Sequence, residues 1–149
     1  MNKTGSNPIR LVSHMLAAVF NSRAMFHREW KRYQTTSNKP DGIAGRWTGE
    51  WISEQSGHHG ELRCVLSPVF ADTYRACFYA GFSFCFRVGY VTDLKAQQTD
   101  GRVLLNGAQD LGALAGGVYR CEGEVQGSDF SCRYSCKYDQ GIFRLKRVH

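Results

Sequence analysis

Two hydrophobic periods divide the chain. In the first part, apolar side chains recur at spacings of three, four or seven residues, which is typical of one helix face; they are Ile9, Val12, Leu16, Val19, Phe26, Trp30 and Tyr33. The sequence Asn7-Pro8 is a typical helix start, because proline is tolerated at the first helical position. We therefore expect residues 8–34 to form one amphipathic helix, followed by a polar linker that contains Pro40 and Gly42.

From Gly45 onward the period is two, as in strands with one buried face. Eight segments are rich in β-branched or aromatic residues and end at Gly, Asp, Ser or Pro. They are Arg46–Ser53, His59–Ser67, Thr73–Ala80, Phe84–Asp93, Gly101–Asn106, Val118–Gln126, Asp129–Tyr138 and Ile142–Val148. Short turns between them favour an antiparallel meander, and eight such strands can close into a barrel without free edges.

The expected fold class is therefore all-β, an eight-stranded antiparallel up-and-down β-barrel preceded by an N-terminal amphipathic α-helix. A β-sandwich is the alternative. In terms of domains, residues 1–42 form the basic helix and linker, and residues 43–149 form the barrel. Two-residue turns at Gly127-Ser128 and Gln140-Gly141 would set the register of the last three strands. The pairs they predict are Val125–Phe130, Gly123–Cys132, Cys121–Tyr134, Tyr138–Phe143 and Cys136–Leu145.

The positive charge lies mainly in the helical part. The chain has 19 Lys and Arg against 13 Asp and Glu, a formal net charge of +6. Seven of those basic side chains lie in residues 1–41, opposed only by Glu29 and Asp41. The basic balance therefore does not indicate nucleic-acid binding by the barrel. Hydrophobic residues make up 42% of the chain, enough for a core, but no apolar run reaches the roughly 20 residues of a membrane-spanning helix.

Three uses of the helix remain open. It can pack on the barrel and cover an apolar surface there. It can bind an anionic membrane surface or a protein through residues 8–34, since basic amphipathic helices with Trp and Phe suit such partners. It can also belong to an export signal, with Ser22-Arg23-Ala24 as a loose cleavage motif, although the positive charges that follow oppose export. We expect a cytoplasmic protein, membrane-associated in the second case, and export is the alternative.

The first and last predicted strands carry a short motif. Gly45 and Trp47 form a Gly-x-Trp, and Arg147 shares the inward parity of Phe143 and Leu145. This resembles the calycin superfamily, which includes lipocalins, fatty-acid-binding proteins and avidins. In lipocalins such a Gly-x-Trp packs near an arginine of the last strand at the closed end of the barrel. The resemblance implies a closed end built from Gly45, Trp47 and Arg147, without indicating one family within the superfamily.

The resemblance also implies a function, because calycins commonly bind small hydrophobic molecules inside the barrel. The expected lining is apolar with tyrosine hydroxyls, which suits such a ligand. It consists of Trp51, Leu62, Cys64, Leu66, Tyr119, Cys121, Tyr134, Cys136 and Tyr138. Non-catalytic binding of a small hydrophobic molecule is therefore the leading hypothesis. The alternative is a barrel filled by its own side chains, acting as a structural or interaction module that docks through its helix.

A third hypothesis is an enzyme with a site at the barrel mouth. His59 and Asp110 lie at the same end of the predicted barrel, where a histidine can take part in recognition or proton transfer. A solvated loop histidine is the simpler interpretation. The sequence contains no Gly-x-Ser-x-Gly elbow and no paired-carboxylate motif. We therefore assign no catalytic residue and no cofactor, and the balance favours a protein that is not an enzyme.

Six cysteines are many for a cytosolic domain. Four share the inward parity: Cys64, Cys121, Cys132 and Cys136. Cys132 and Cys136 are about 13 Å apart along one strand, too far for a disulfide. Cys121 lies diagonally between them, so either could pair with it in an oxidising compartment, and buried reduced thiols are the alternative. Because no Cys-x2-Cys pair occurs, no metal site is predicted.

Overall fold

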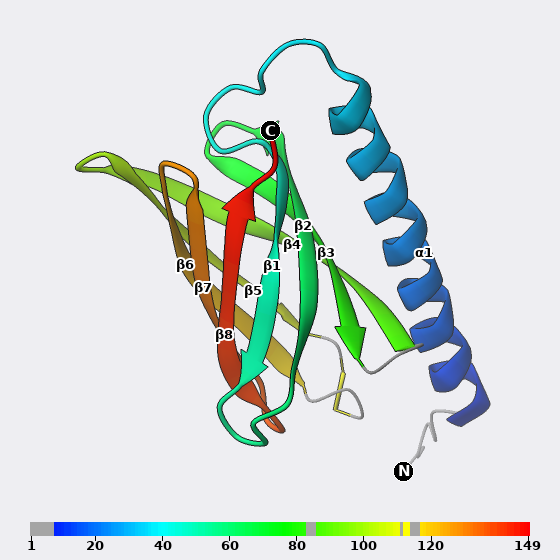
Figure 1. Ribbon diagram of the computed structural model, residues 1–149. Coiled ribbons are helices and arrows are strands. Elements are labelled where there is room, and N and C mark those ends of the chain that lie inside the picture. The colour runs from blue at the N-terminus through cyan, green and yellow to red at the C-terminus, as the bar shows by residue number, and fades with distance from the viewer. Residues whose placement is uncertain (1–7, 83–85, 111, 114–116) are drawn as a thin grey trace.

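The computed structural model describes residues 8–82, 86–110, 112–113 and 117–149, with side chains in the helix from Asn21 onward. Over these residues the chain forms one helix and eight strands: α1 (Pro8–Thr35), β1 (Gly45–Ser53), β2 (His59–Phe70), β3 (Thr73–Phe82), β4 (Phe86–Thr99), β5 (Arg102–Asp110), β6 (Val118–Gln126), β7 (Asp129–Ser135) and β8 (Gln140–Arg147). The strands pair antiparallel in chain order, and β1 pairs with β8 to close the barrel (Figure 1). The predicted fold class is confirmed, and the β-sandwich alternative is wrong.

Alternating side chains fill the barrel most densely at the end where β1 begins and β8 ends. Trp47, Leu66 and Leu94 are 0% exposed there, and Phe130 is 1% exposed. The Trp47 and Phe130 rings meet edge to face with centroids 5.7 Å apart. β-branched and aromatic residues suit a pleated surface with one buried face, and here that face is the barrel interior. We call this end of the barrel the closed end.

The hairpin of β6 and β7 has the predicted register. Val125 lies opposite Phe130, and Cys121 lies opposite Tyr134. The turn between the two strands contains Gly127 at a φ of 59°, a left-handed conformation that glycine adopts without strain. Strict alternation on both strands and a two-residue turn were therefore sufficient to predict this pairing.

The predicted register of β7 and β8 is wrong. β7 ends at Ser135, and Phe143 pairs with Cys132 instead of Tyr138. Cys136 therefore does not pair with Leu145; Phe130 does. Gly141 belongs to β8 and is not a turn residue. The position holds a glycine because a Cβ there would lie 2.0 Å from the Ile52 carbonyl oxygen. Close packing of strands explains this glycine, and the turn lies earlier, where the Cys136 amide donates to the Asp139 carbonyl.

The ladder between β4 and β5 covers only part of either strand. Lys95–Thr99 pair with Arg102–Asn106 through a turn in which Asp100 and Gly101 both have positive φ. This conformation is typical of a tight two-residue hairpin, which extends outward at the upper left of Figure 1. The segment expected to be a loop after residue 93 is thus mostly strand. Beyond Asn106, β5 pairs with β6 but no longer with β4.

The helix packs on the outer face of the barrel, along β2, β3 and β4 (Figure 1). Phe26 is 1% exposed and stacks on Tyr79 with ring centroids 4.9 Å apart. Trp30 lies between the guanidinium groups of Arg46 and Arg63. Burial of an aromatic side chain such as Phe26 stabilises this docking by roughly 1.5–3 kcal/mol. For residues 21–35, the first of the three uses predicted for the helix is confirmed.

Gly89 on β4 sets how closely the helix approaches the sheet. A Cβ at this position would lie 2.8 Å from the backbone nitrogen of Arg23. Val65 and Cys77 are 0% exposed beneath the same part of the helix. Any side chain at position 89 would push the helix backbone away from the surface that it covers. Among the described residues, no helix has an apolar stretch sufficient to cross a membrane.

Candidate ligand-binding site at the open end

The end of the barrel opposite Trp47 is filled differently. Several side chains there face inward and yet are partly exposed to solvent; they are Tyr90, Gln109, Tyr119, Cys136 and Phe143. These residues occupy inward positions of the barrel wall, and each keeps part of its surface accessible to solvent. We call this end of the barrel, defined by those five residues, the open end.

Aromatic rings from five strands form a continuous series along the inner wall. The Tyr119 and Tyr90 centroids are 5.9 Å apart, and Tyr90 lies 6.1 Å from Phe78. Phe78 lies 5.2 Å from Phe143, which stacks on Tyr134 at 4.8 Å. These separations are typical of favourable aromatic pairs. The five rings, called the aromatic band below, offer a flat apolar molecule a preformed contact surface.

A polar network anchors the edge of the aromatic band. Asp139, in the turn between β7 and β8, accepts a hydrogen bond from the Ser53 hydroxyl at 2.6 Å and one from the Tyr134 hydroxyl at 2.9 Å. Ser56 donates to Ser53 at 3.0 Å. Burial raises the pKa of Tyr134, and the hydrogen bond to Asp139 raises it further. Tyr134 therefore stays neutral, and its ring is held in place by the carboxylate of Asp139.

Two polar side chains of the open end, Tyr119 and Gln109, form no hydrogen bond with Asp139. Burial raises the pKa of Tyr119, whose hydroxyl lies beside the Cys136 thiol, so this phenol also stays neutral. Gln109 pairs with Tyr119 across β5 and β6. Among the buried side-chain nitrogen and oxygen atoms of the described residues, Gln109 Oε1 alone has no hydrogen-bond partner.

Most of the predicted lining lies inside the barrel, but at two different depths. Leu62, Cys64 and Leu66 are at most 1% exposed and belong to the packed core. Trp51 is 5% exposed, and its indole nitrogen donates to the Gly81 carbonyl at 3.0 Å. Cys121 is also buried in the core. These side chains face inward and pack in the core, and Trp51 lies directly opposite Phe143 of the open end, across β1 and β8.

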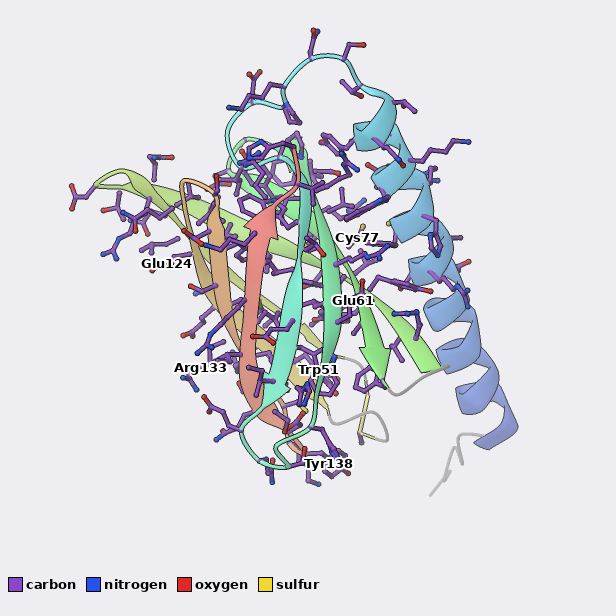
Figure 2. All side chains as sticks on the ribbon, in the orientation of Figure 1. Trp51, Glu61, Cys77, Glu124, Arg133 and Tyr138 are labelled. Atoms are coloured by element: carbon purple, nitrogen blue, oxygen red, sulfur yellow. A yellow bond between two sulfur atoms is a disulfide. The ribbon has the colours of Figure 1, made fainter. Side chains whose placement is uncertain are left out.

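The other predicted lining residues lie nearer to solvent. Tyr119 and Tyr134 belong to the aromatic band, and Cys136 lies just beyond the end of β7. Tyr138 is 58% exposed and projects from the turn between β7 and β8 (Figure 2). The prediction that Tyr138 lines the interior does not hold, because β7 ends three residues earlier than expected.

The structure does not bring His59 and Asp110 together. Both side chains are exposed, and their strands, β2 and β5, are separated in the barrel by β3 and β4. The Asp110 carboxylate accepts a hydrogen bond from the Gly112 amide at 2.8 Å, which shapes the local turn. His59 begins β2 and Asp110 ends β5, both at the open end of the barrel, but the two side chains form no acid–base pair.

Arg147 covers the closed end, in the place that the resemblance implies. Its guanidinium lies 4.6 Å from the Trp47 ring centroid and donates to the carbonyls of Gly42 at 2.7 Å and Ala44 at 2.9 Å. Trp47 also donates to the Ile43 carbonyl at 3.2 Å. Gly45 has a φ of 125°, where a side chain would be strained. This arrangement covers the closed end, where Trp47 is 0% exposed.

One of the two disulfides that the sequence left open is present. Cys121 and Cys132 form a disulfide between β6 and β7 with a Cα separation of 6.4 Å. Cys77 faces outward and lies between the barrel and the helix (Figure 2), and burial raises its pKa to about 11. Burial also raises the pKa of Cys64 well above its usual value. Cys85 lies outside the described residues.

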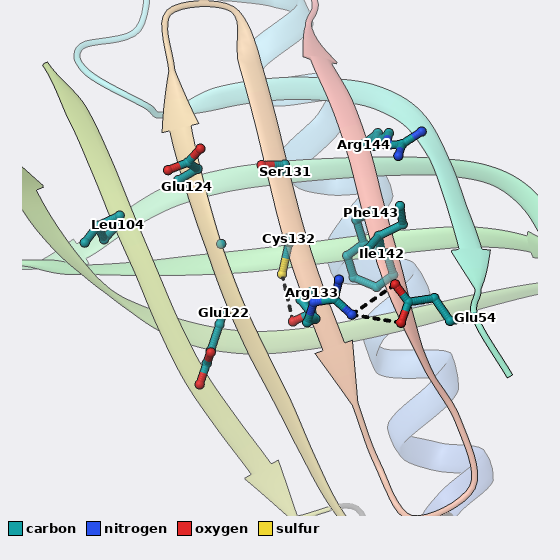
Figure 3. Close-up of a pocket in the computed structure, with 11 residues that line it drawn as sticks. Glu54, Leu104, Glu122, Glu124, Ser131, Cys132, Arg133, Ile142, Phe143 and Arg144 are labelled. Atoms are coloured by element: carbon teal, nitrogen blue, oxygen red, sulfur yellow. Dashed lines mark hydrogen bonds and ion pairs between the residues drawn. The ribbon is translucent and has the colours of Figure 1, made fainter.

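A depression on the outer face of β5 to β8 is a second concave surface (Figure 3). It has a volume of about 580 Å³ and a lining rich in charged groups. Arg133 donates two hydrogen bonds to the Glu54 carboxylate, at 2.8 and 3.0 Å, and Glu124 is paired with Arg102. Because these charges are paired with one another, the depression is a weaker candidate than the open end.

The lining expected from the sequence lacks three residues of the open end, Tyr90, Gln109 and Phe143, and also Asp139 at the edge of the aromatic band. Tyr90 and Phe143 lie in predicted strands at inward parity, so the alternation already marked them as interior positions. Gln109 lies beyond the predicted end of its strand, and Asp139 was expected at the edge of a turn. No sequence pattern marked these two polar side chains as part of the interior.

No protein-family model and no curated protein sequence matches the chain. Among solved structures, the chain is similar to a point mutant of the fluorescent protein UnaG. The two sequences are 6% identical, the match covers 72% of this chain and 96% of that one, and the TM-score is 0.40. A likeness at this level concerns the fold alone. The strand order of the chain itself establishes the fold as a closed eight-stranded antiparallel barrel.

Proposed function

We propose that the protein binds a small hydrophobic molecule at the open end of the barrel without catalysing a reaction on it. The observation that carries this proposal is the partial solvent exposure of the inward-facing rings of Tyr90, Tyr119 and Phe143. Apolar surface that is accessible to water gains roughly 25 cal/mol per Å² when a ligand covers it. The proposal therefore assigns the closed end to stability and the open end to binding.

The aromatic band also limits the cost of binding. Tyr134 is held by Asp139, and Phe143 stacks on Tyr134, so these rings lose little conformational freedom when a ligand arrives. The neutral phenols favour an uncharged ligand, since burial raises the pKa of both Tyr119 and Tyr134. A neutral, flat and mainly aromatic molecule fits this environment best.

The test is titration with N-phenylnaphthylamine, an uncharged dye that fluoresces in apolar surroundings. We expect saturable binding with one site per chain, together with quenching of tryptophan fluorescence. Phe143→Ala removes one ring of the band and should weaken binding roughly tenfold. Ile142→Ala is the matched control, because Ile142 precedes Phe143 on β8 and faces outward. Absence of saturable binding, or equal binding by the two variants in their folded state, would refute the proposal.

A second candidate function is attachment to an anionic membrane surface through α1. The apolar face of residues 21–35 lies on the barrel, whereas Arg28 and Lys31 are exposed, with 71% of the Arg28 side chain accessible. Such an attachment would be electrostatic and would place the protein at the cytoplasmic face of a membrane, each basic residue contributing about 1 kcal/mol near the surface.

This second candidate is tested by sedimentation with phosphatidylcholine vesicles, with and without phosphatidylserine. The double variant Arg28→Glu/Lys31→Glu should lose binding to the anionic vesicles, and added salt should weaken the binding of the unmodified protein. The control Arg144→Glu/Lys146→Glu changes the charge equally on β8, which the helix does not cover. Equal binding by the two double variants would rule out attachment through the helix.

A further inference from the structure

We propose that Gln109 selects the ligand by accepting a hydrogen bond from it, so that the ligand is a neutral aromatic molecule bearing an O–H or N–H donor. This inference rests on the proposed binding function of the open end. Its basis is the Oε1 atom of Gln109, which is buried and lacks a hydrogen-bond partner within the described part of the chain. Buried polar atoms in folded proteins are nearly always paired, so an acceptor without a partner at an inward position of the barrel requires an explanation.

The topology explains why no neighbouring strand satisfies this amide. Continuing the register that joins Lys95 to Asn106 would bring Gln109 opposite Thr92, but the ladder between β4 and β5 ends before that point. Gly107 still lies so close to β4 that a Cβ there would be 2.6 Å from the Asp93 carbonyl oxygen. Beyond it, Gln109 has a paired strand on one side only, that of β6. On the side of β4, therefore, no paired strand stands opposite Gln109, and its Oε1 has no donor within the described part of the chain.

The surroundings of Gln109 define the rest of the ligand. Tyr119 lies directly opposite it, and the Tyr90 ring is 5.9 Å from the Tyr119 ring. A donor that reaches Oε1 must therefore be attached to a group that packs against these rings, and a flat aromatic group does so best. The carboxylate of Asp139 already accepts hydrogen bonds from Ser53 and Tyr134, so Gln109 is the acceptor that is left for a ligand donor. Phenols, indoles and aryl amines are the classes that combine these properties.

A hydrogen bond from the ligand to Gln109 Oε1 would affect the binding free energy and the stability of the ligand-free protein differently. An amide oxygen that has lost water and gained no donor destabilises the ligand-free protein, and a ligand donor removes that penalty on binding. A Gln109 variant without the acceptor should therefore lose ligand preference without losing stability. A purely structural glutamine would behave in the opposite way, because its removal would lower stability.

The experiment compares 2-naphthol with 2-methylnaphthalene, which has nearly the same shape and no donor. We expect the full-length protein to bind 2-naphthol about tenfold more tightly, although the methyl compound is the more hydrophobic of the two. In Gln109→Met the preference should fall to about twofold or less through weaker binding of 2-naphthol alone. Gln97→Met is the matched control, because Gln97 is exposed on β4, and it should keep the full preference.

A second measurement separates selection from folding. Thermal unfolding of ligand-free Gln109→Met should occur at the same temperature as in the unmodified protein or above it. Equal binding of both compounds by the unmodified protein would overturn the role of Gln109 and leave the proposed binding function intact. A preference that persists in Gln109→Met, or a marked fall in its unfolding temperature, would also overturn it. Binding of neither compound, and of no N-phenylnaphthylamine, would overturn both proposals.

Discussion

At the closed end of the barrel, Trp47 and Phe130 fill the interior completely and Arg147 covers them; at the open end, inward-facing rings stay in contact with solvent. The same eight strands form both ends. The difference lies in the contacts that complete each end. At the closed end, the Arg147 guanidinium donates to a carbonyl of the linker. At the open end, a hydrogen bond from Ser53 to Asp139 joins two hairpin turns. A small barrel can thus be solid at one end and accessible at the other.

This comparison changes how the two leading sequence hypotheses relate to each other. A filled barrel and a ligand-binding barrel were alternatives for the whole domain. In the structure, the first describes the closed end, and the second is our proposal for the open end. At the closed end, Trp47, Leu66 and Leu94 are 0% exposed, so apolar burial there contributes strongly to stability. Substitutions at the two ends should therefore have separable effects on stability and on binding.

The largest expected effect is that of Trp47→Ala. Removing a fully buried indole should destabilise the protein by about 3–5 kcal/mol, a large part of the stability of a domain this size. Tyr119→Ala at the open end should destabilise it by about 1 kcal/mol, because the side chain is already partly exposed. Urea unfolding measures both values. Similar losses for the two variants would contradict the comparison between the ends.

Arg147→Ala should destabilise the protein by about 2 kcal/mol. The substitution removes the donors to the carbonyls of Gly42 and Ala44 and the cation–π contact with Trp47. Arg144→Ala is the control, since Arg144 is exposed on the same strand and should change stability by less than about 0.5 kcal/mol. If urea unfolding gave the same stability for both variants, Arg147 would not be what secures the closed end.

Thiol labelling should distinguish the two ends directly. We expect iodoacetamide to modify Cys136 roughly tenfold faster than Cys64, because Cys136 is partly exposed at the open end and burial raises the pKa of Cys64. Peptide mass spectrometry over a time course measures both rates. Saturating N-phenylnaphthylamine should slow the labelling of Cys136. A rate that does not respond to the dye would place the dye away from the open end.

The smallest expected effect is a loss of stability in alkaline solution. Because burial raises the pKa of Tyr134 above its usual value near 10, the neutral phenol stabilises the folded state fully below pH 10. That contribution is lost as the pH rises through the higher pKa of the folded state. Urea unfolding from pH 9 to 11 should show a shallower decline in Tyr134→Phe, which has no phenol to ionise. An identical decline in both proteins would contradict this role.

The sequence pattern predicted the strands much better than it predicted how their ends meet. The strict alternation of β6 and β7 was sufficient to predict their register, since a shift of one residue would turn every apolar side chain outward. Gly141 was misinterpreted as a turn residue because a glycine required for close packing and one required for a turn look alike in a sequence. The same error lengthened β7 and placed Tyr138 in the interior.

The amino-acid sequence by itself determined the helix, the change of period after the linker, and the inward parity that the interior residues follow, because these depend on the spacing of neighbours along the chain. Only the tertiary structure decided which end stays open and which polar atom inside lacks a partner. Gln109 shows why: its hydrogen bonding depends on where the ladder between β4 and β5 ends, and no spacing in the sequence marks that point. Periodicity reports the face on which a side chain lies, and the neighbours it meets there depend on closure of the barrel.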